Sequence, residues 1–160
     1  MTVPLRVLFV CTGNTCRSAM AEYIARRLID ERGMRDIEAG GAGTAAWEGS
    51  PASDGALLVA LERETDLSPH RARLLTRELV EAADLILAMG PNHVERIAAL
   101  GGVGKVHLLT EYASRGASER GIADPFGGEL GGYRDTFEEL EQELNLVLDR
   151  IAAQQSPNVP

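Results

Sequence analysis

The sequence lacks the features that mark membrane and secreted proteins. Its 160 residues contain no run of about 18 apolar residues, so we expect no membrane-spanning helix and no membrane partner. The first residues lack a charged segment followed by a long apolar one, so we also expect no signal peptide. Two cysteines are too few for a disulfide-rich scaffold. These absences predict a protein of the reducing cytoplasm.

Positive charge is also scarce. The 16 basic residues, of which only Lys105 is a lysine, are outnumbered by 24 acidic residues, and the formal net charge is −8. Binding to a nucleic-acid backbone needs an excess of positive charge, so we expect no nucleic-acid partner. A small anion pocket built from a few well-placed groups is still compatible with this balance.

The hydrophobic content of 44% is enough for one packed domain. A nearly continuous apolar run at 5–10 predicts a strand that is buried on both faces of a parallel sheet. Further strands are predicted at 36–39, 85–89 and 106–109. The apolar periodicity predicts helices at 19–32, 54–65, 91–100 and 133–153, and the segment from residue 79 to the strand at 85–89 is expected to hold the end of another helix.

Strands that alternate with helices on short connections predict an α/β fold. We expect a single doubly wound, Rossmann-like domain over residues 1–153, with a four-stranded parallel sheet and helices on both faces. Residues 154–160 are expected to form a disordered tail.

The segment that carries chemistry is 11–18, Cys-Thr-Gly-Asn-Thr-Cys-Arg-Ser, between the first predicted strand and the first predicted helix. Ligands of open α/β sheets bind at the carboxyl ends of strands, and the first amides of a helix attract anions. Gly13 and Asn14 tolerate the left-handed backbone of a tight loop. Arg17 can bind two oxygens of a tetrahedral oxyanion. The segment therefore predicts a phosphate pocket.

Cys11 is the predicted nucleophile of this pocket. A helix N-terminus and a neighbouring arginine can lower the pKa of a thiol from about 8.5 to between about 3.5 and 7.5. The resulting thiolate would attack the phosphorus of a bound phosphate ester. We expect the Ser18 hydroxyl to donate a hydrogen bond to this thiolate.

The octapeptide 11–18 is similar to the signature of the low-molecular-weight protein tyrosine phosphatases. A second match, Asp-Pro-Phe-Gly-Gly at 124–128, resembles the Asp-Pro loop of that family. Segments 41–44, 70–73 and 83–89 are also similar to family patterns. The resemblance covers residues 5 to about 150.

The resemblance implies a cysteine-dependent protein phosphatase without a metal or other cofactor. Cys11 would form a phosphocysteine intermediate, Arg17 would hold the equatorial oxygens, and Asp124 would act as general acid and then as general base. Phosphorylated proteins would be its substrates, phosphate or other oxyanions would bind as product or inhibitor, and we expect a monomer. The residues expected to bind phosphate or substrate are Thr12, Gly13, Asn14, Thr15, Cys16, Arg17, Ser18 and Phe126.

Two positions bear on the substrate. Thr15 stands where tyrosine-directed members usually carry a bulkier aliphatic residue, and Phe126 stands where they often have tyrosine. Both resemble the bacterial protein arginine phosphatases of this superfamily. A guanidinium leaving group is planar, polar and cationic, so a small hydroxyl and a flanking ring suit it. Phosphoarginine hydrolysis is the main prediction. The alternatives are a phosphotyrosine phosphatase and, from another class, a phosphate-binding or redox-sensing module with weak catalysis.

Two further positions carry expectations of their own. Cys16 could trap oxidised Cys11 as a reversible disulfide, which would make the pair redox-sensitive. Arsenate reductases with a similar loop need further cysteines downstream, and this chain has none after Cys16. Gly41 stands where the family often has a serine that binds the loop asparagine, so we expect Asn14 to be less firmly held.

Overall fold

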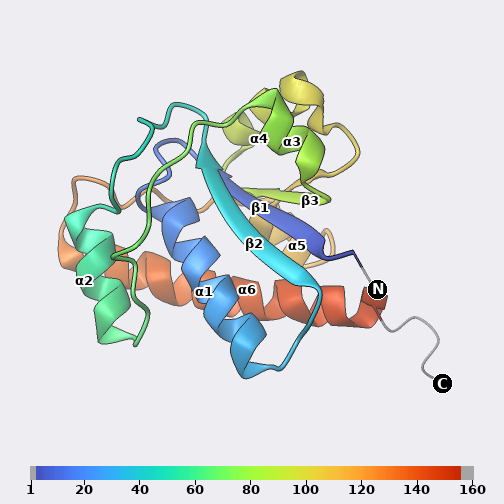
Figure 1. The fold of residues 1–160 in the computed structure, drawn as a ribbon. Helices are drawn as coiled ribbons and strands as arrows, with labels where there is room; N and C mark the ends of the chain where they lie inside the picture. Colours follow the sequence, from blue (N-terminus) through green and yellow to red (C-terminus); the bar gives the residue numbers. More distant parts are fainter. Residues whose placement is uncertain (1–2, 156–160) are drawn as a thin grey trace.

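The computed structural model describes residues 3–155 and has the predicted α/β architecture (Figure 1). Four parallel strands form one sheet in the order β2-β1-β3-β4. The strands are β1 (Leu5–Cys11), β2 (Ile37–Gly43), β3 (Leu85–Ala88) and β4 (Val106–Leu108).

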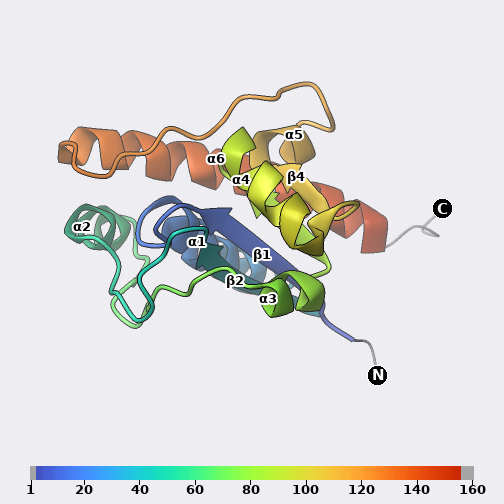
Figure 2. The same ribbon diagram turned by 90° about the horizontal axis from the view of Figure 1, so that it is seen from above.

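Helices connect the strands and lie on both sides of the sheet (Figure 2). They are α1 (Arg17–Glu31), α2 (Asp54–Glu62), α3 (Arg77–Ala82), α4 (Pro91–Ile97), the π-helical turn η1 (Ala98–Gly102), α5 (Leu109–Ala113) and α6 (Leu130–Gln155). The short α5 was not predicted. Helix α6 continues through Gln155, so residues 154 and 155, which were expected to belong to a disordered tail, are helical. Residues 156–160 lie outside the described residues.

Strand β1 is the centre of the core, and its apolar run is explained by burial on both faces. Val7 and Phe9 pack in the larger core cluster with α1, α2, α5 and α6. Leu8 and Val10 point to the other face and pack with α3 and α4. Successive side chains of a strand alternate between faces, so a strand between two helical layers must be apolar at almost every position.

Strand β2 extends four residues beyond its predicted end, because its glycine-rich second half continues to pair with β1 as far as Cys11 and Gly43. The outward carbonyl of Ala39 accepts hydrogen bonds from the Arg26 side chain, and that of Gly41 accepts one from Arg73 Nε at 3.1 Å. A Cβ at Gly43 would lie 2.4 Å from the Thr12 carbonyl oxygen, so glycine is required there for the 12–16 loop to approach.

The strand order places the loop after β1 at a ligand-binding position. Strand β1 lies between β2 and β3. The connection after β1 leads to β2 on one side of it, and the connection after β2 crosses back to β3 on the other side, so the order of the strands reverses at β1. Crevices at such switch points are the usual ligand sites of doubly wound sheets. Within residues 3–155, none of the helices has the length and apolar character needed to cross a membrane.

Candidate active site

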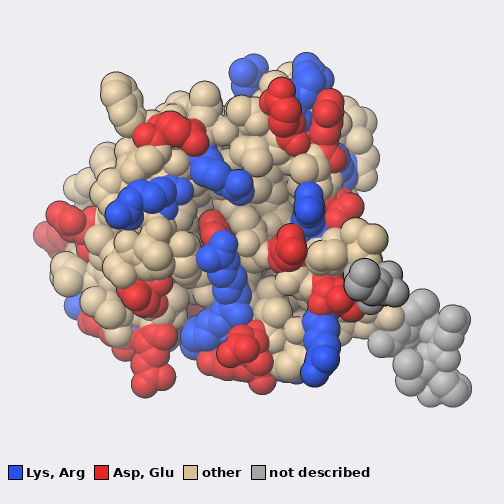
Figure 3. All heavy atoms as spheres, viewed as in Figure 1, with Lys and Arg blue, Asp and Glu red and all other residues tan. Residues whose placement is uncertain are grey.

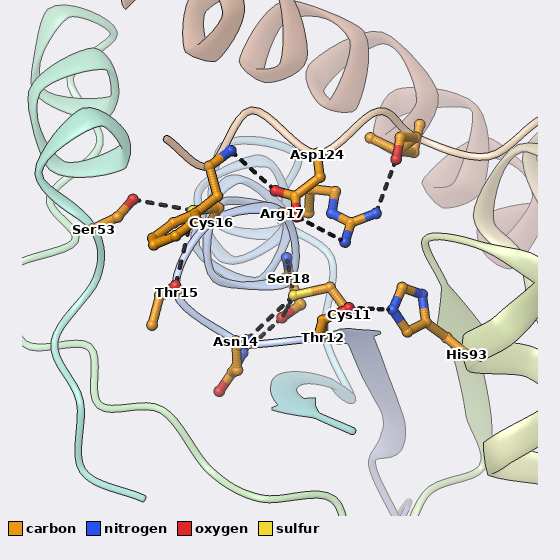
Figure 4. Close-up of polar contacts among 12 residues, drawn as sticks. Cys11, Thr12, Asn14, Thr15, Cys16, Arg17, Ser18, Ser53, His93 and Asp124 are labelled. Atoms are coloured by element: carbon orange, nitrogen blue, oxygen red, sulfur yellow. Dashed lines mark hydrogen bonds and ion pairs between the residues drawn. The ribbon is translucent and has the colours of Figure 1, made fainter. Parts of the chain in front are cut away.

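The phosphate loop joins the last residue of β1, Cys11, to the first residue of α1, Arg17. Asn14 adopts the left-handed backbone with φ 55°, as expected for one of the two candidate positions, whereas Gly13 does not. The amides of the loop and of the first turn of α1 gather around the Cys11 sulfur (Figure 4).

The Cys11 thiol is buried and receives several hydrogen bonds. The backbone amides of Asn14 and Ser18 point to Cys11 Sγ at 3.3 and 3.5 Å, and Ser18 Oγ lies 3.0 Å from the sulfur. Asn14 Nδ2 donates to Ser18 Oγ at 2.7 Å, so the proton of the Ser18 hydroxyl points to an acceptor, either the nearby sulfur or the more distant Ala42 carbonyl oxygen at 3.4 Å. The predicted Ser18 contact is therefore present.

The expectation that Asn14 would be loosely held is wrong. Its side chain is fully buried, donates to Ser18, and accepts the Arg73 amide at 3.0 Å. Its carbonyl oxygen accepts a hydrogen bond from His70 Nε2 at 2.6 Å. Burial lowers the pKa of His70, which keeps the ring neutral while Nε2 donates. These contacts replace the hydroxyl that Gly41 lacks.

Arg17 and Asp124 meet at the mouth of the loop. Arg17 is buried, donates from Nη1 to the Ile122 carbonyl at 3.0 Å, and lies 3.5 Å from Asp124 Oδ2 through Nη2. The other carboxylate oxygen of Asp124 accepts the Phe126 amide at 3.0 Å, so the 124–126 turn fixes the carboxylate. Arg17 Nε is buried and has no partner among the described residues.

A cavity of about 200 Å³ opens between the loop and Asp124. Most of the predicted site residues line it, and Phe126 stands at its rim with 68% of its surface exposed. Asn14 and Ser18 do not line it, because they lie behind the loop and support the thiol instead. The lining residues are Cys11, Thr12, Gly13, Thr15, Cys16, Arg17, Asp124 and Phe126.

Cys16 has partners that sequence reasoning missed. Its sulfur lies 3.1 Å from Ser53 Oγ and 3.8 Å from the Tyr133 hydroxyl. Burial raises the pKa of the Cys16 thiol, which opposes its ionisation. Both Cys11 and Cys16 are free thiols. The disulfide between them under oxidation stays a prediction.

His93 is a second missed residue. It lies in α4, is 1% exposed, and its Nε2 is 2.9 Å from the Thr12 hydroxyl. Burial, reinforced by the positive charge of Arg17, lowers the pKa of His93 to about 4. The imidazole is therefore neutral at pH 7. It fixes Thr12 without adding charge to the cavity.

The low pKa of His93 predicts a loss of stability in acid. Its unfolded-state pKa is near 6.5 and its folded-state pKa is about 4, so below pH 6.5 the unfolded state binds the proton first. The stability present at neutral pH is lost as the pH falls through this window, by about 2 kcal/mol at about pH 5. Urea unfolding at about pH 7.5 and 5 measures this loss.

The matched variants for this measurement are His93→Gln and His107→Gln. We expect His93→Gln to reduce the loss between these two pH values by about 2 kcal/mol and to leave the contribution of His70, whose pKa burial also lowers. The substitution at the half-exposed His107 should leave the loss as in the wild type. A wild-type pH dependence in His93→Gln would contradict the interpretation.

The described site combines the Cys11 thiol, the side chain of Arg17 and the Asp124 carboxyl group in one cavity. A family model described as low molecular weight phosphotyrosine protein phosphatase matches residues 6–156. The chain is 39% identical over 147 residues to the protein-arginine-phosphatase of Bacillus subtilis (strain 168), covering 91% of this chain and 95% of the relative. It is 31% identical over 163 aligned positions to low molecular weight protein-tyrosine phosphatase A of Mycobacterium tuberculosis, covering 100% and 99%.

A solved structure agrees with these relatives. The YwlE arginine phosphatase, in a mutant with a phosphorylated active-site serine, has a TM-score of 0.87 to this chain at 35% identity. The match covers 92% of this chain and 96% of the other. The similarity thus extends over the whole sheet and both helical layers.

Proposed function

Because the chain belongs to the low-molecular-weight phosphotyrosine protein phosphatase family, we propose that it hydrolyses phosphoarginine in proteins. It is a protein phosphatase by family, and its named relatives act on either arginine or tyrosine. The observation that carries the reaction is the single cavity in which Cys11, Arg17 and Asp124 meet.

In the first step the Cys11 thiolate attacks phosphorus in line with the leaving group. A phosphorus–sulfur bond forms as the bond from phosphorus to the guanidine nitrogen breaks. Asp124 donates its proton to that nitrogen, and the substrate protein leaves with an unmodified arginine side chain. Arg17 and the loop amides hold the three equatorial oxygens, whose charge they stabilise without a metal ion.

In the second step water hydrolyses the phosphocysteine. Asp124, now ionised, removes a proton from the water as its oxygen attacks phosphorus, and the phosphorus–sulfur bond breaks. Cys11 returns as the thiolate that the Ser18 hydroxyl and two backbone amides stabilise. Inorganic phosphate leaves as the product.

The preference for arginine is supported by the walls of the cavity. Thr15 and Phe126 both line it, and Phe126 is exposed where a leaving group would enter. A guanidinium binds the face of an aromatic ring and donates hydrogen bonds to hydroxyl and carboxylate oxygens. The similarity to the Bacillus subtilis protein-arginine-phosphatase supports the same choice. The similarity to a protein-tyrosine phosphatase keeps phosphotyrosine as the second candidate.

A competition experiment tests the substrate directly. One protein sample that carries both phosphoarginine and phosphotyrosine is incubated with the enzyme, and each modification is followed by mass spectrometry. We expect phosphoarginine to disappear first, and neither to disappear with the Cys11→Ser variant. Faster loss of phosphotyrosine would assign the chain to the tyrosine-directed phosphatases. Loss of neither would favour a phosphate-binding or redox-sensing module.

The same experiment on Thr15→Ile tests the role of the threonine. An aliphatic side chain at this position removes the hydroxyl and adds bulk next to the guanidinium. We expect the ratio of phosphoarginine to phosphotyrosine hydrolysis to fall by about tenfold or more. An unchanged ratio would mean that Thr15 does not set the preference.

We further propose that the enzyme works as a monomer in the cytoplasm. Cys11, Arg17 and Asp124, which fill every role of the proposed reaction, all belong to this chain, so the reaction needs no residue from a second copy. Catalysis requires Cys11 to stay reduced, which fits a reducing compartment.

A further inference from the structure

A second and larger cavity lies on the other side of the phosphate loop. Its volume is about 460 Å³, and it wraps around the edge strand β2 between α1, the 70–73 segment and α3. Figure 3 shows arginine or lysine side chains gathered around a hollow on this face of the molecule. We call it the arginine pocket. Its charged lining residues are Arg6, Arg26, Arg71, Arg73, Glu22 and Glu38.

The arginine pocket is positively charged although the chain is acidic. Four arginines and two glutamates line it, which leaves an excess of two positive charges in a chain with a net charge of −8. Glu38 pairs with Arg6 at 3.5 Å, and the buried Glu22 pairs with Arg26. Arg73 is not close enough to Glu22 for an ion pair, although its charge acts on that carboxylate.

Arg71 and Arg73 supply the excess charge. Both are exposed, they flank the buried Ala72, and both line the pocket. Their printed partners are neutral carbonyl oxygens, of His70 and Ser68 for Arg71 and of Gly41 for Arg73. In the chain as described, no carboxylate lies within ion-pair distance of either guanidinium. Two guanidiniums that line one pocket without a carboxylate partner suit a phosphate dianion.

The floor of the arginine pocket is apolar. Leu8 and Leu79 line it on the α3 side of β2, where the missing side chain of Gly40 leaves room beside Leu8, and Ala39 lines it on the α1 side. The Tyr23 ring forms part of the wall, under the Arg26 guanidinium at 4.7 Å. Cavities of about 300–1,000 Å³ hold organic molecules rather than bare ions. The occupant therefore needs an apolar or aromatic body as well as a charged end.

We propose that the arginine pocket is a second anion site, which binds a small organic phosphate dianion. The phosphate group lies between Arg71 and Arg73, and the organic body covers the apolar floor beside β2. The site is separate from the catalytic cavity, but two of its lining residues, His70 and Arg73, also hold the loop of that cavity in place. The Arg73 amide and His70 Nε2 both bind Asn14, which in turn binds Ser18 behind the Cys11 thiol.

Amide chemical shifts of ¹⁵N-labelled protein test the proposal, with phenylphosphonate as a probe whose phosphorus–carbon bond the enzyme does not cleave. We expect two separate saturation curves. The shifts of the amides in the 12–16 loop should give one curve, and those of the pocket amides should give the other. The pocket amides are those of Tyr23, Ala39, Gly40 and Arg71. Inorganic phosphate, which has no body to cover the apolar floor, should fill the second site at least about tenfold more weakly.

The matched variants are Arg71→Gln and Arg96→Gln. Both remove one charge from an exposed arginine, but Arg96 lies on α4 outside the pocket. We expect Arg71→Gln to weaken only the pocket curve, by about tenfold, as for the loss of one charge-assisted hydrogen bond. Arg96→Gln should change neither curve.

Three results would overturn the proposal. The pocket amides could stay unmoved, they could follow the loop curve with the same midpoint, or they could respond equally to the two variants. Equal binding of inorganic phosphate and phenylphosphonate would contradict the claim that the occupant needs an organic body. The loop curve reports the catalytic cavity by itself, so these results are independent of the proposed phosphatase reaction.

Discussion

Replacement of Cys11 by serine is expected to reduce kcat by at least about 10⁴-fold, because it removes the nucleophile of the proposed reaction. A serine hydroxyl is far less ionised at neutral pH than a thiol, and the donors around Cys11 Sγ stabilise an anion that serine rarely forms. Steady-state hydrolysis of an aryl phosphate gives the ratio of wild-type to variant kcat.

The same variant identifies the attacked residue. Any phosphoserine that forms slowly at position 11 should persist, since an alkoxide is a poorer leaving group than a thiolate. Intact-protein mass spectrometry after incubation with substrate is expected to show one added phosphoryl group, located at residue 11 by peptide analysis. A phosphorylated active-site serine in a mutant of the YwlE arginine phosphatase is a precedent for such a trapped state.

The Cys11→Ser variant could also be inactive because it does not fold, and a measurement of phosphate binding tests this. The backbone amides and Arg17 are unchanged in Cys11→Ser, so the variant should still bind inorganic phosphate in calorimetry. Retained binding with a kcat within tenfold of the wild type would mean that Cys11 is not the nucleophile.

The parts of the fold that were predicted correctly are those with a local pattern. The run at 5–10 is apolar because β1 is buried between two helical layers, and that cause leaves a clear trace in the sequence. Strand β2 was predicted too short because its second half is glycine-rich and its edge is completed by the side chains of Arg26 and Arg73. Such tertiary contacts have no local pattern.

The candidate site divides in the same way. Residues 11–18 are contiguous, so their chemistry could be predicted from spacing and from the first turn of a helix. Asp124 was found because an Asp-Pro pair is distinctive. Ser53, Tyr133 and His93 were missed, since each reaches the loop from a distant segment and is an ordinary residue in its own helix or cap. Their roles depend on packing that only the structure supplies.

Asp124→Asn is expected to reduce kcat by about 10²–10⁴-fold on substrates with a poor leaving group, because the amide cannot donate a proton. Asparagine keeps the shape of the side chain, and its carbonyl oxygen can still accept the Phe126 amide that now binds Asp124 Oδ1. The turn that presents the residue should therefore persist. The loss then reports proton transfer rather than a displaced loop.

The size of that loss depends on the leaving group, which separates acid catalysis from a structural effect. Nitrophenolate leaves readily without a proton, whereas phenolate needs one. We therefore expect Asp124→Asn to impair the hydrolysis of phenyl phosphate much more than that of p-nitrophenyl phosphate. The control Asp135→Asn, at an exposed position of α6, should leave both rates unchanged. Equal losses on the two substrates would contradict a role as general acid, because a distorted cavity slows both alike.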